Sequence, residues 1–64
     1  MAWLAVNKDG VEKYFGFQKP NRDYYGFWYE EVLGEELQGK TLEPGTIEKL
    51  IGRKLIWTDD PVEI

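Results

Sequence analysis

The stretch "WLAVNKDGVEKYFGF", residues 3–17, decides the fold, because it reads as two strands joined by a tight turn. Leu4 and Val6 stand at alternate positions of its first part, and a period of two is typical of a β-strand. A turn follows, since Asn7 can bond its own backbone and Gly10 can adopt the left-handed conformation that closes such a turn. The stretch therefore predicts a β-hairpin.

We place this hairpin at residues 2–17, with its second strand over residues 11–17. Outside it, Pro20 and Asn21 indicate a turn. Residues 24–31 then predict a third strand, because they are rich in the aromatic residue types that strands favour. Both faces of this strand are aromatic in the middle, so we expect neither face to be covered by water alone.

The second half of the chain contains short elements separated by glycines. Residues 37–42 are expected to form a short edge strand. The segment "GTIEKLIG", residues 45–52, predicts a short helix, because its apolar residues recur three and four positions apart on one face. That face consists of Ile47, Leu50 and Ile51. Residues 53–57 are expected to form the last strand, and residues 62–64 a short tail.

Together these elements predict one domain, residues 1–64, of the α+β class and mostly β. We expect a small antiparallel sheet or an SH3-like barrel of about 4–5 strands, with one short helix before the last strand. A chain of 64 residues hides only about 60% of the surface that its unfolded form exposes. Disulfides and a structural zinc site cannot add stability, since the chain has no Cys and no His. An aromatic core and assembly into a homo-oligomer are therefore expected.

The composition excludes several classes of function. The net charge of −4, from 12 acids and 8 bases, disfavours binding to the backbone of DNA or RNA. No stretch approaches the roughly 20 apolar residues of a membrane span, and the first residues lack the features of a signal peptide. The chain also has no His, Cys or Ser, so the commonest catalytic bases and nucleophiles are missing. We expect a cytoplasmic protein that is not an enzyme and uses no cofactor or metal.

The aromatic run "DYYGFWYEE", residues 23–31, allows three interpretations. It can be a core strand, a contact between copies of the chain, or a platform on which a base or another flat ring stacks. Stacking of a base on an aromatic side chain is worth about 1–3 kcal/mol, and nearby cations could bind phosphates. The candidate ligand-binding residues are Arg22, Tyr24, Tyr25, Trp28, Lys13, Lys19 and Arg53.

Four of the twelve acids lie close together between Glu30 and Glu36. Such a concentration of charge could instead bind a basic protein or imitate a nucleic acid, and this binding should weaken with salt. The candidate partner-binding residues are Glu30, Glu31, Glu35 and Glu36.

Both ends of the chain carry motifs that resemble those of short uncharacterised proteins of phages and prophages. Residues 3–10 fit the opening W-L-A-V-x-x-D-G, and residues 45–63 fit the closing G-T-I-x-K-L-I-G-x-x-L-x-W-x-D-x-P-V-E. The resemblance implies an accessory protein in the cytoplasm of an infected bacterium. In that setting we expect it to counter host antiviral defence by sequestering a nucleotide signal. The alternatives are an acidic inhibitor of a host protein, a nucleic-acid mimic, or an assembly protein of the virion.

Overall fold

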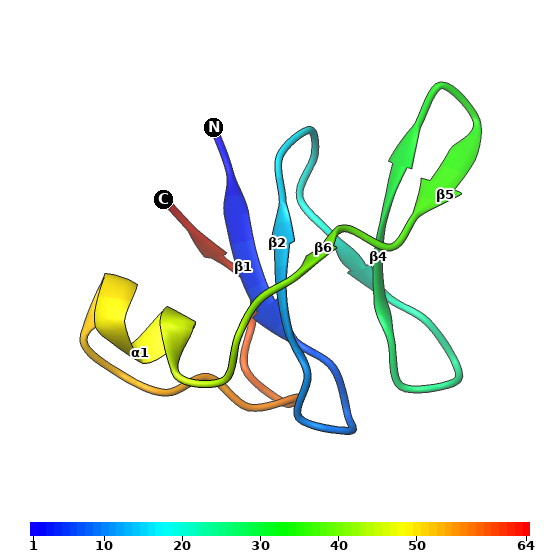
Figure 1. Ribbon diagram of the computed structural model, residues 1–64. Coiled ribbons are helices and arrows are strands. Elements are labelled where there is room, and N and C mark those ends of the chain that lie inside the picture. The colour runs from blue at the N-terminus through cyan, green and yellow to red at the C-terminus, as the bar shows by residue number, and fades with distance from the viewer.

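The computed structural model covers residues 1–64 and consists of two small antiparallel sheets and one short helix (Figure 1). The expectation of a mostly β domain with one short helix before the last strand is confirmed. No strand pair joins the two sheets into a barrel. In chain order the elements are β1 (Trp3–Val6), β2 (Glu12–Phe15), β3 (Asn21–Arg22), β4 (Trp28–Val32), β5 (Glu35–Leu37), β6 (Lys40–Thr41), α1 (Thr46–Ile51) and β7 (Val62–Glu63).

The first sheet has the strand order β6-β2-β1-β7, and the predicted hairpin forms its centre. β1 and β2 pair from Trp3 opposite Phe15 to Val6 opposite Glu12. Their turn closes with a hydrogen bond of 2.9 Å from the Gly10 N–H to the Asn7 carbonyl, and Gly10 has φ 89°. The hairpin is therefore confirmed, although β2 ends at Phe15 rather than at residue 17.

Helix α1 covers one face of the first sheet and closes the main core. Ile47 of the helix is buried together with Leu4 and Val6 of β1, and Leu55 completes this cluster. Gly52 ends the helix with φ 80°, and its N–H donates to the Glu48 carbonyl at 2.9 Å. The predicted helix is thus present, but one residue of its expected apolar face, Leu50, is 58% exposed.

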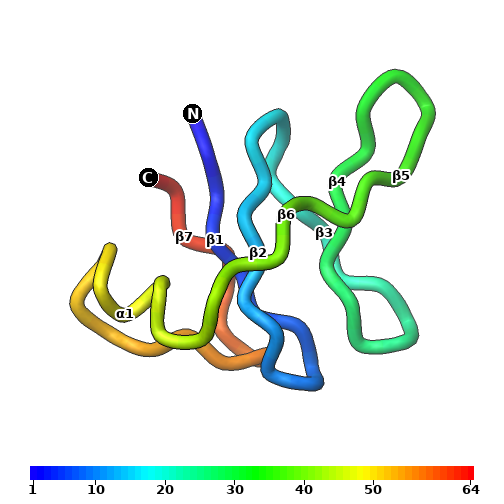
Figure 2. The backbone as a smooth tube through the Cα atoms, viewed as in Figure 1, coloured from blue at the N-terminus to red at the C-terminus, as the bar shows by residue number.

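The second sheet has the order β3-β4-β5 and joins the first through Trp28. Ala5 and Phe15 of the first sheet are buried against this tryptophan of β4. Its indole N–H donates to the Val6 carbonyl at 2.8 Å. Beyond this junction, β4 and β5 extend away from the rest of the molecule as a hairpin (Figure 2).

The prediction of a strand over residues 24–31 is wrong in its first half, where the chain turns. The Asp23 carboxylate accepts N–H groups from Tyr25 at 2.8 Å and from Phe27 at 2.9 Å. Gly26, with φ 97°, completes the turn, so the strand begins only at Trp28. Local hydrogen bonds of an aspartate here override the strand preference of the aromatic residues.

Two further predictions of strands are wrong. Residues 37–42 do not form one edge strand, because the chain passes between the sheets there and contributes to β5 in one and β6 in the other. Residues 53–57 form no strand. The edge of β1 pairs instead with residues 62–63, which were expected to be a tail. The structure contains no helix whose length and apolar character would let it cross a membrane.

Candidate functional site

Two of the predicted ligand-binding residues, Arg22 and Trp28, make their contacts within the protein, Arg22 at the surface and Trp28 in the core. Trp28 is buried, with its ring edge-on to that of Trp57 at 5.5 Å. The Arg22 guanidinium lies 4.5 Å from the Trp28 ring and 5.4 Å from the Trp57 ring. It also donates to the carbonyls of Trp57 and Asp59, at 3.1 and 3.2 Å. Arg22 therefore fastens the chain around residue 57 to β3, and these donors are not free for a phosphate.

The other predicted ligand-binding residues are spread over the molecule. Tyr24 and Tyr25 lie together in the β3–β4 turn, 94% and 80% exposed, with their ring centroids 5.4 Å apart. Lys13 of β2 donates to the Thr41 hydroxyl at 2.8 Å, and the Lys19 ammonium lies 5.8 Å from the Trp3 ring. Arg53 follows α1 and is exposed. Of the predicted set, the two tyrosines alone remain as a shared exposed surface.

The four predicted partner-binding carboxylates divide into one buried group and three exposed ones. Glu30 is 2% exposed, and its Oε1 accepts the N–H groups of Phe17 and Gln18, both at 3.0 Å. It fixes the chain that leaves β2 and is not presented to a partner. The exposed carboxylates belong to Glu31, Glu35 and Glu36.

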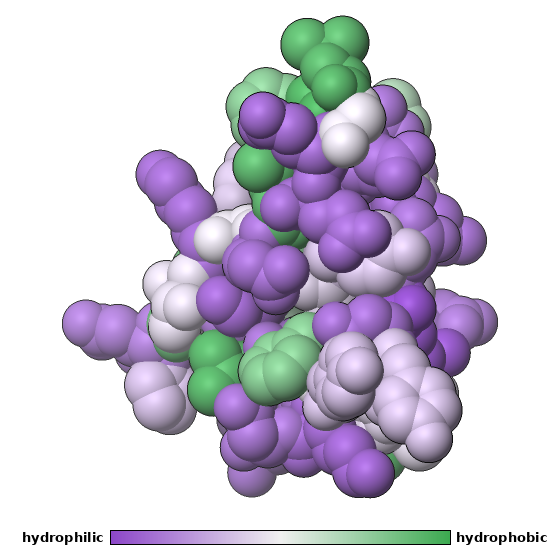
Figure 3. Space-filling view, turned by 90° about the vertical axis from the view of Figure 1, so that its right-hand side faces the viewer, coloured by the Kyte–Doolittle hydropathy of each residue, from purple (hydrophilic) through white to green (hydrophobic).

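The three exposed carboxylates surround the tip of the β4–β5 hairpin. Val32 pairs with Glu35, so the loop between the strands has only two residues, Leu33 and Gly34. Both have positive φ, 53° and 82°, which is the pattern of a type I′ turn. Leu33 is 98% exposed at this tip. Apolar atoms accordingly stand out at the top of the space-filling view, where the hairpin ends (Figure 3).

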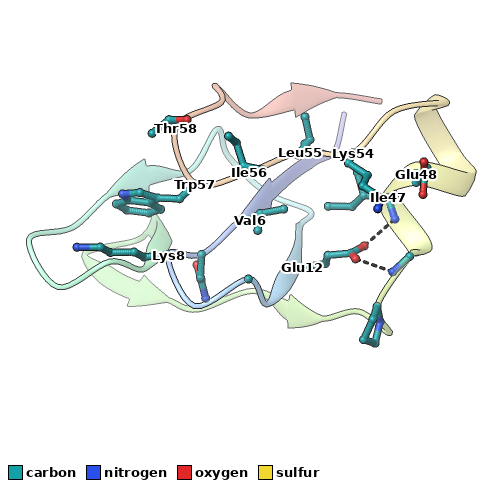
Figure 4. Close-up of a pocket in the computed structure, with 14 residues that line it drawn as sticks. Val6, Lys8, Glu12, Ile47, Glu48, Lys54, Leu55, Ile56, Trp57 and Thr58 are labelled. Atoms are coloured by element: carbon teal, nitrogen blue, oxygen red, sulfur yellow. Dashed lines mark hydrogen bonds between the residues drawn. The ribbon is translucent and has the colours of Figure 1, made fainter.

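A cleft of about 680 Å3 lies between the β1–β2 turn, the start of α1 and the chain from residue 54 to residue 58. Glu12 of β2 holds one side of this cleft together (Figure 4). One of its carboxylate oxygens accepts the Gly45 N–H at 2.6 Å, and the other accepts the Ile47 N–H at 2.8 Å. The start of the short helix is thereby fixed to the first sheet, and the cleft has a defined wall.

Sequence reasoning missed both the hairpin tip and the cleft. The tip had no clear signal, because Leu33-Gly34 is not among the residue pairs that favour a two-residue hairpin loop. The cleft had no local signal, because residues 8 and 57, which both line it, are far apart along the chain.

No protein-family model, curated protein or solved structure matches this chain. The resemblance to phage proteins therefore stays a prediction. Its two motifs nevertheless occupy one part of the structure, since residues 3–10 contribute β1 and residues 45–63 contribute α1 and β7. All four residues of the main core cluster lie in these motifs, namely Leu4, Val6, Ile47 and Leu55. The β4–β5 hairpin lies entirely outside them.

Proposed function

We propose that this chain is a non-catalytic accessory protein of phage type that binds a host protein through the β4–β5 hairpin. The observation that carries the proposal is the exposed leucine at the tip of an acidic hairpin. The partner is a protein with an apolar pocket surrounded by basic side chains. Leu33 enters the pocket, and Glu31, Glu35 and Glu36 meet the surrounding cations.

Three features of the hairpin are unfavourable in the free protein. A non-glycine residue in the left-handed conformation costs roughly 1–2 kcal/mol, and type I′ turns favour Asn, Asp or Gly where Leu33 stands. A leucine side chain that is 98% exposed also leaves its apolar surface in water. Finally, Glu31 and Glu36 are direct cross-strand partners, and like charges in such a pair destabilise a hairpin.

A basic partner with an apolar pocket relieves two of these three costs at once. Burial of Leu33 removes its side chain from water, while basic groups of the partner neutralise the opposed carboxylates of Glu31 and Glu36. Strained residues that a fold does not require are most often found where they serve binding. An apolar centre within a polar rim is also the common anatomy of a protein interface.

The phage context suggests which kind of host protein is bound. The resemblance of the two terminal motifs implies that the chain acts in an infected bacterium, where occupying an antiviral defence protein is a useful role. The acidic rim favours a protein with a nucleic-acid-binding surface, since such surfaces are basic.

The substitution Leu33→Asn tests the proposal, because it should raise the stability of the free protein and abolish its binding function. Asn suits the first position of a type I′ turn, so the free protein should gain about 1 kcal/mol. In a domain of this size that raises the unfolding midpoint by roughly 4–8 °C. We would express the chain in bacterial strains that each carry one defence system and measure the plating efficiency of a sensitive phage.

Wild-type protein should restore plating against at least one system, and Leu33→Asn should lose this effect despite its greater stability. Leu50→Gln is the matched control, since Leu50 is also exposed but lies on α1. It should act as the wild type does. A Leu33→Asn variant that restores plating fully, or a wild type that acts against no defence system, would contradict the proposal.

Sequestration of a nucleotide signal is the second candidate, and the exposure of Tyr24 and Tyr25 favours it. Two adjacent rings that are 94% and 80% exposed are available for stacking. Thermal unfolding in the presence of cyclic di- and trinucleotides tests this function, since a ligand at 100 times its Kd adds about 2.7 kcal/mol. The rise in midpoint should disappear in Tyr24→Ala and Tyr25→Ala. No rise with any nucleotide would exclude it.

A further inference from the structure

The cleft beside α1 has two ends of different chemistry. Figure 4 shows Lys8 and Trp57 at one end, and Glu48 and Lys54 at the other, beside the helix. Val6 and Leu55 form an apolar floor between the ends. The carboxylates of the cleft are thus gathered at the helical end, whereas the opposite end offers an ammonium group, an indole and the Thr58 hydroxyl.

Asn7 supplies an unpaired donor to this cleft. The residue is 3% exposed, and its Oδ1 accepts the backbone N–H of Trp28 at 2.9 Å. This bond fixes the orientation of the amide, because an oxygen must face the N–H, and so the NH2 group points elsewhere. That nitrogen donates to no group of the protein. No fully buried side-chain nitrogen or oxygen lacks a partner, so this nitrogen keeps some accessible surface, and Asn7 is one of the residues that line the cleft.

Because this nitrogen keeps accessible surface, solvent or a ligand can accept its hydrogen bonds. Water can serve in the free protein. An anion serves better here, because Lys8 directly follows Asn7 in the chain and brings a positive charge to the same end of the cleft. The Trp57 indole and Ile56, which is 60% exposed, offer apolar surface beside these donors.

We propose that this end of the cleft binds a small organic anion that carries a flat ring. The anionic group accepts hydrogen bonds from the Asn7 amide and the Lys8 ammonium, and the ring lies against Trp57 and Ile56. The whole cleft, of which this end is a part, has a volume of about 680 Å3, within the range of roughly 300–1,000 Å3 that small-molecule sites occupy. The cleft shares no lining residue with the β4–β5 hairpin or with Tyr24 and Tyr25, so the proposal stands independently of the proposed function.

The test is a titration of the isotope-labelled full chain with AMP, followed by NMR. We expect saturable shifts of the backbone amides at Asn7, Lys8 and Thr58 and of the Trp57 indole N–H. Adenosine, which has the ring without the phosphate, should bind at least fivefold more weakly. Indole-3-acetate separates the two sources of such anions, since tighter binding than AMP identifies a carboxylate ligand and weaker binding a phosphate ligand.

Two variants connect the shifts to the proposed donors. Lys8→Met keeps the side-chain stem that packs beside Gly26 and should weaken AMP binding about fivefold. Lys49→Met is its matched control outside the cleft and should bind as the wild type does. Asn7→Asp retains an acceptor for the Trp28 N–H but replaces the donor with a negative charge, so AMP binding should be lost.

Three results would overturn the proposal. The first is the absence of saturable shifts with both AMP and indole-3-acetate at millimolar concentration. The second is equal binding of adenosine and AMP, which would remove the role of the anion. The third is a set of shifts confined to Tyr24 and Tyr25, which would place the ligand on the β3–β4 turn instead.

Discussion

The hairpin β1–β2 and the hairpin β4–β5 solve the same geometric problem with different residues. Each needs positive φ in its turn, and the first uses Gly10, for which this conformation carries no penalty. The second has Leu33 there, although Asn or Gly would be less strained. β1 is also covered by α1 and by the second sheet, whereas the tip of β4–β5 is exposed. Local rules are followed where the chain builds its core and broken where the chain protrudes.

We use the word scaffold for the buried residues that hold the fold together, and display for the exposed residues that are available for binding. In a sequence that folds well, turn chemistry, charge pairing and burial agree with one another, and departures concentrate at functional sites. Every residue of the main core lies in the two motifs at the chain ends, while the departures lie between them. The departures from the local rules therefore fall in the middle of the chain, outside the segments that build the main core.

The largest effect is expected for Trp28→Ala. It empties the site where the two sheets meet and removes the bond from the indole to the Val6 carbonyl. Such a truncation costs about 3–5 kcal/mol, enough to unfold a small domain. Tyr24→Ala, from the same aromatic run, should change the free energy of unfolding by less than about 0.5 kcal/mol. Urea unfolding followed by circular dichroism measures both, and equal losses would break the distinction between scaffold and display.

A smaller loss is expected for Gly39→Ala, between β5 and β6. A Cβ added there would lie 2.6 Å from the Tyr14 carbonyl oxygen, which is backbone and cannot move aside easily. Overpacking of this kind costs roughly 1–3 kcal/mol, and φ 70° adds conformational strain. Gly34→Ala, at the exposed tip, has the strain at φ 82° but meets no atom within 4 Å. The midpoint of Gly39→Ala should therefore fall further than that of Gly34→Ala in the same thermal scan.

Glu12→Gln should cost about 1.5 kcal/mol, because only one of its two side-chain oxygens remains as an acceptor for Gly45 and Ile47. Loss of the bond should appear as faster hydrogen exchange at Ile47. The same change at Glu35, which is exposed on β5, should leave stability within about 0.5 kcal/mol. Unaltered exchange at Ile47 in Glu12→Gln would show that the carboxylate does not hold the start of the helix.

The smallest effect, and a favourable one, is expected for Glu36→Lys. It converts the like-charge pair with Glu31 into an attractive one and should add roughly 0.2–1 kcal/mol. The gain should shrink as salt rises, because both groups are exposed. A destabilised variant would mean that the two carboxylates do not repel each other in the free protein.

The sequence predicts the scaffold well because its signals there are local. The alternation of β1, the turn at Asn7 to Gly10 and the spacing of apolar residues in α1 each act within a few residues. The aromatic run was harder, since strand propensity and turn chemistry disagree there. Asp23 and Gly26 stand at the two ends of a four-residue turn, and these positions decided the outcome over the two tyrosines between them.

The remaining errors depend on contacts between distant segments. Whether residues 53–57 or residues 62–63 pair with β1 is set by how α1 leads the chain back to the sheet, which no local pattern reveals. Arg22 looked like a free cation beside aromatic residues, but its partners are carbonyls some 35 positions further along the chain. The cleft likewise follows from the packing of distant segments, whereas the tip at Leu33 follows from the register of neighbouring strands.

The bonds from Glu12 to the start of α1 also impose an order of events on folding. A helix of six residues cannot persist alone, since isolated helices shorter than about 12–15 residues are marginal in water. Its first N–H groups find their acceptor 33 and 35 positions earlier in the chain, on a strand that pairs locally with β1. The helix is therefore expected to persist only once the β1–β2 hairpin has placed the Glu12 carboxylate. Glu12 thereby couples the formation of α1 to the formation of the first sheet.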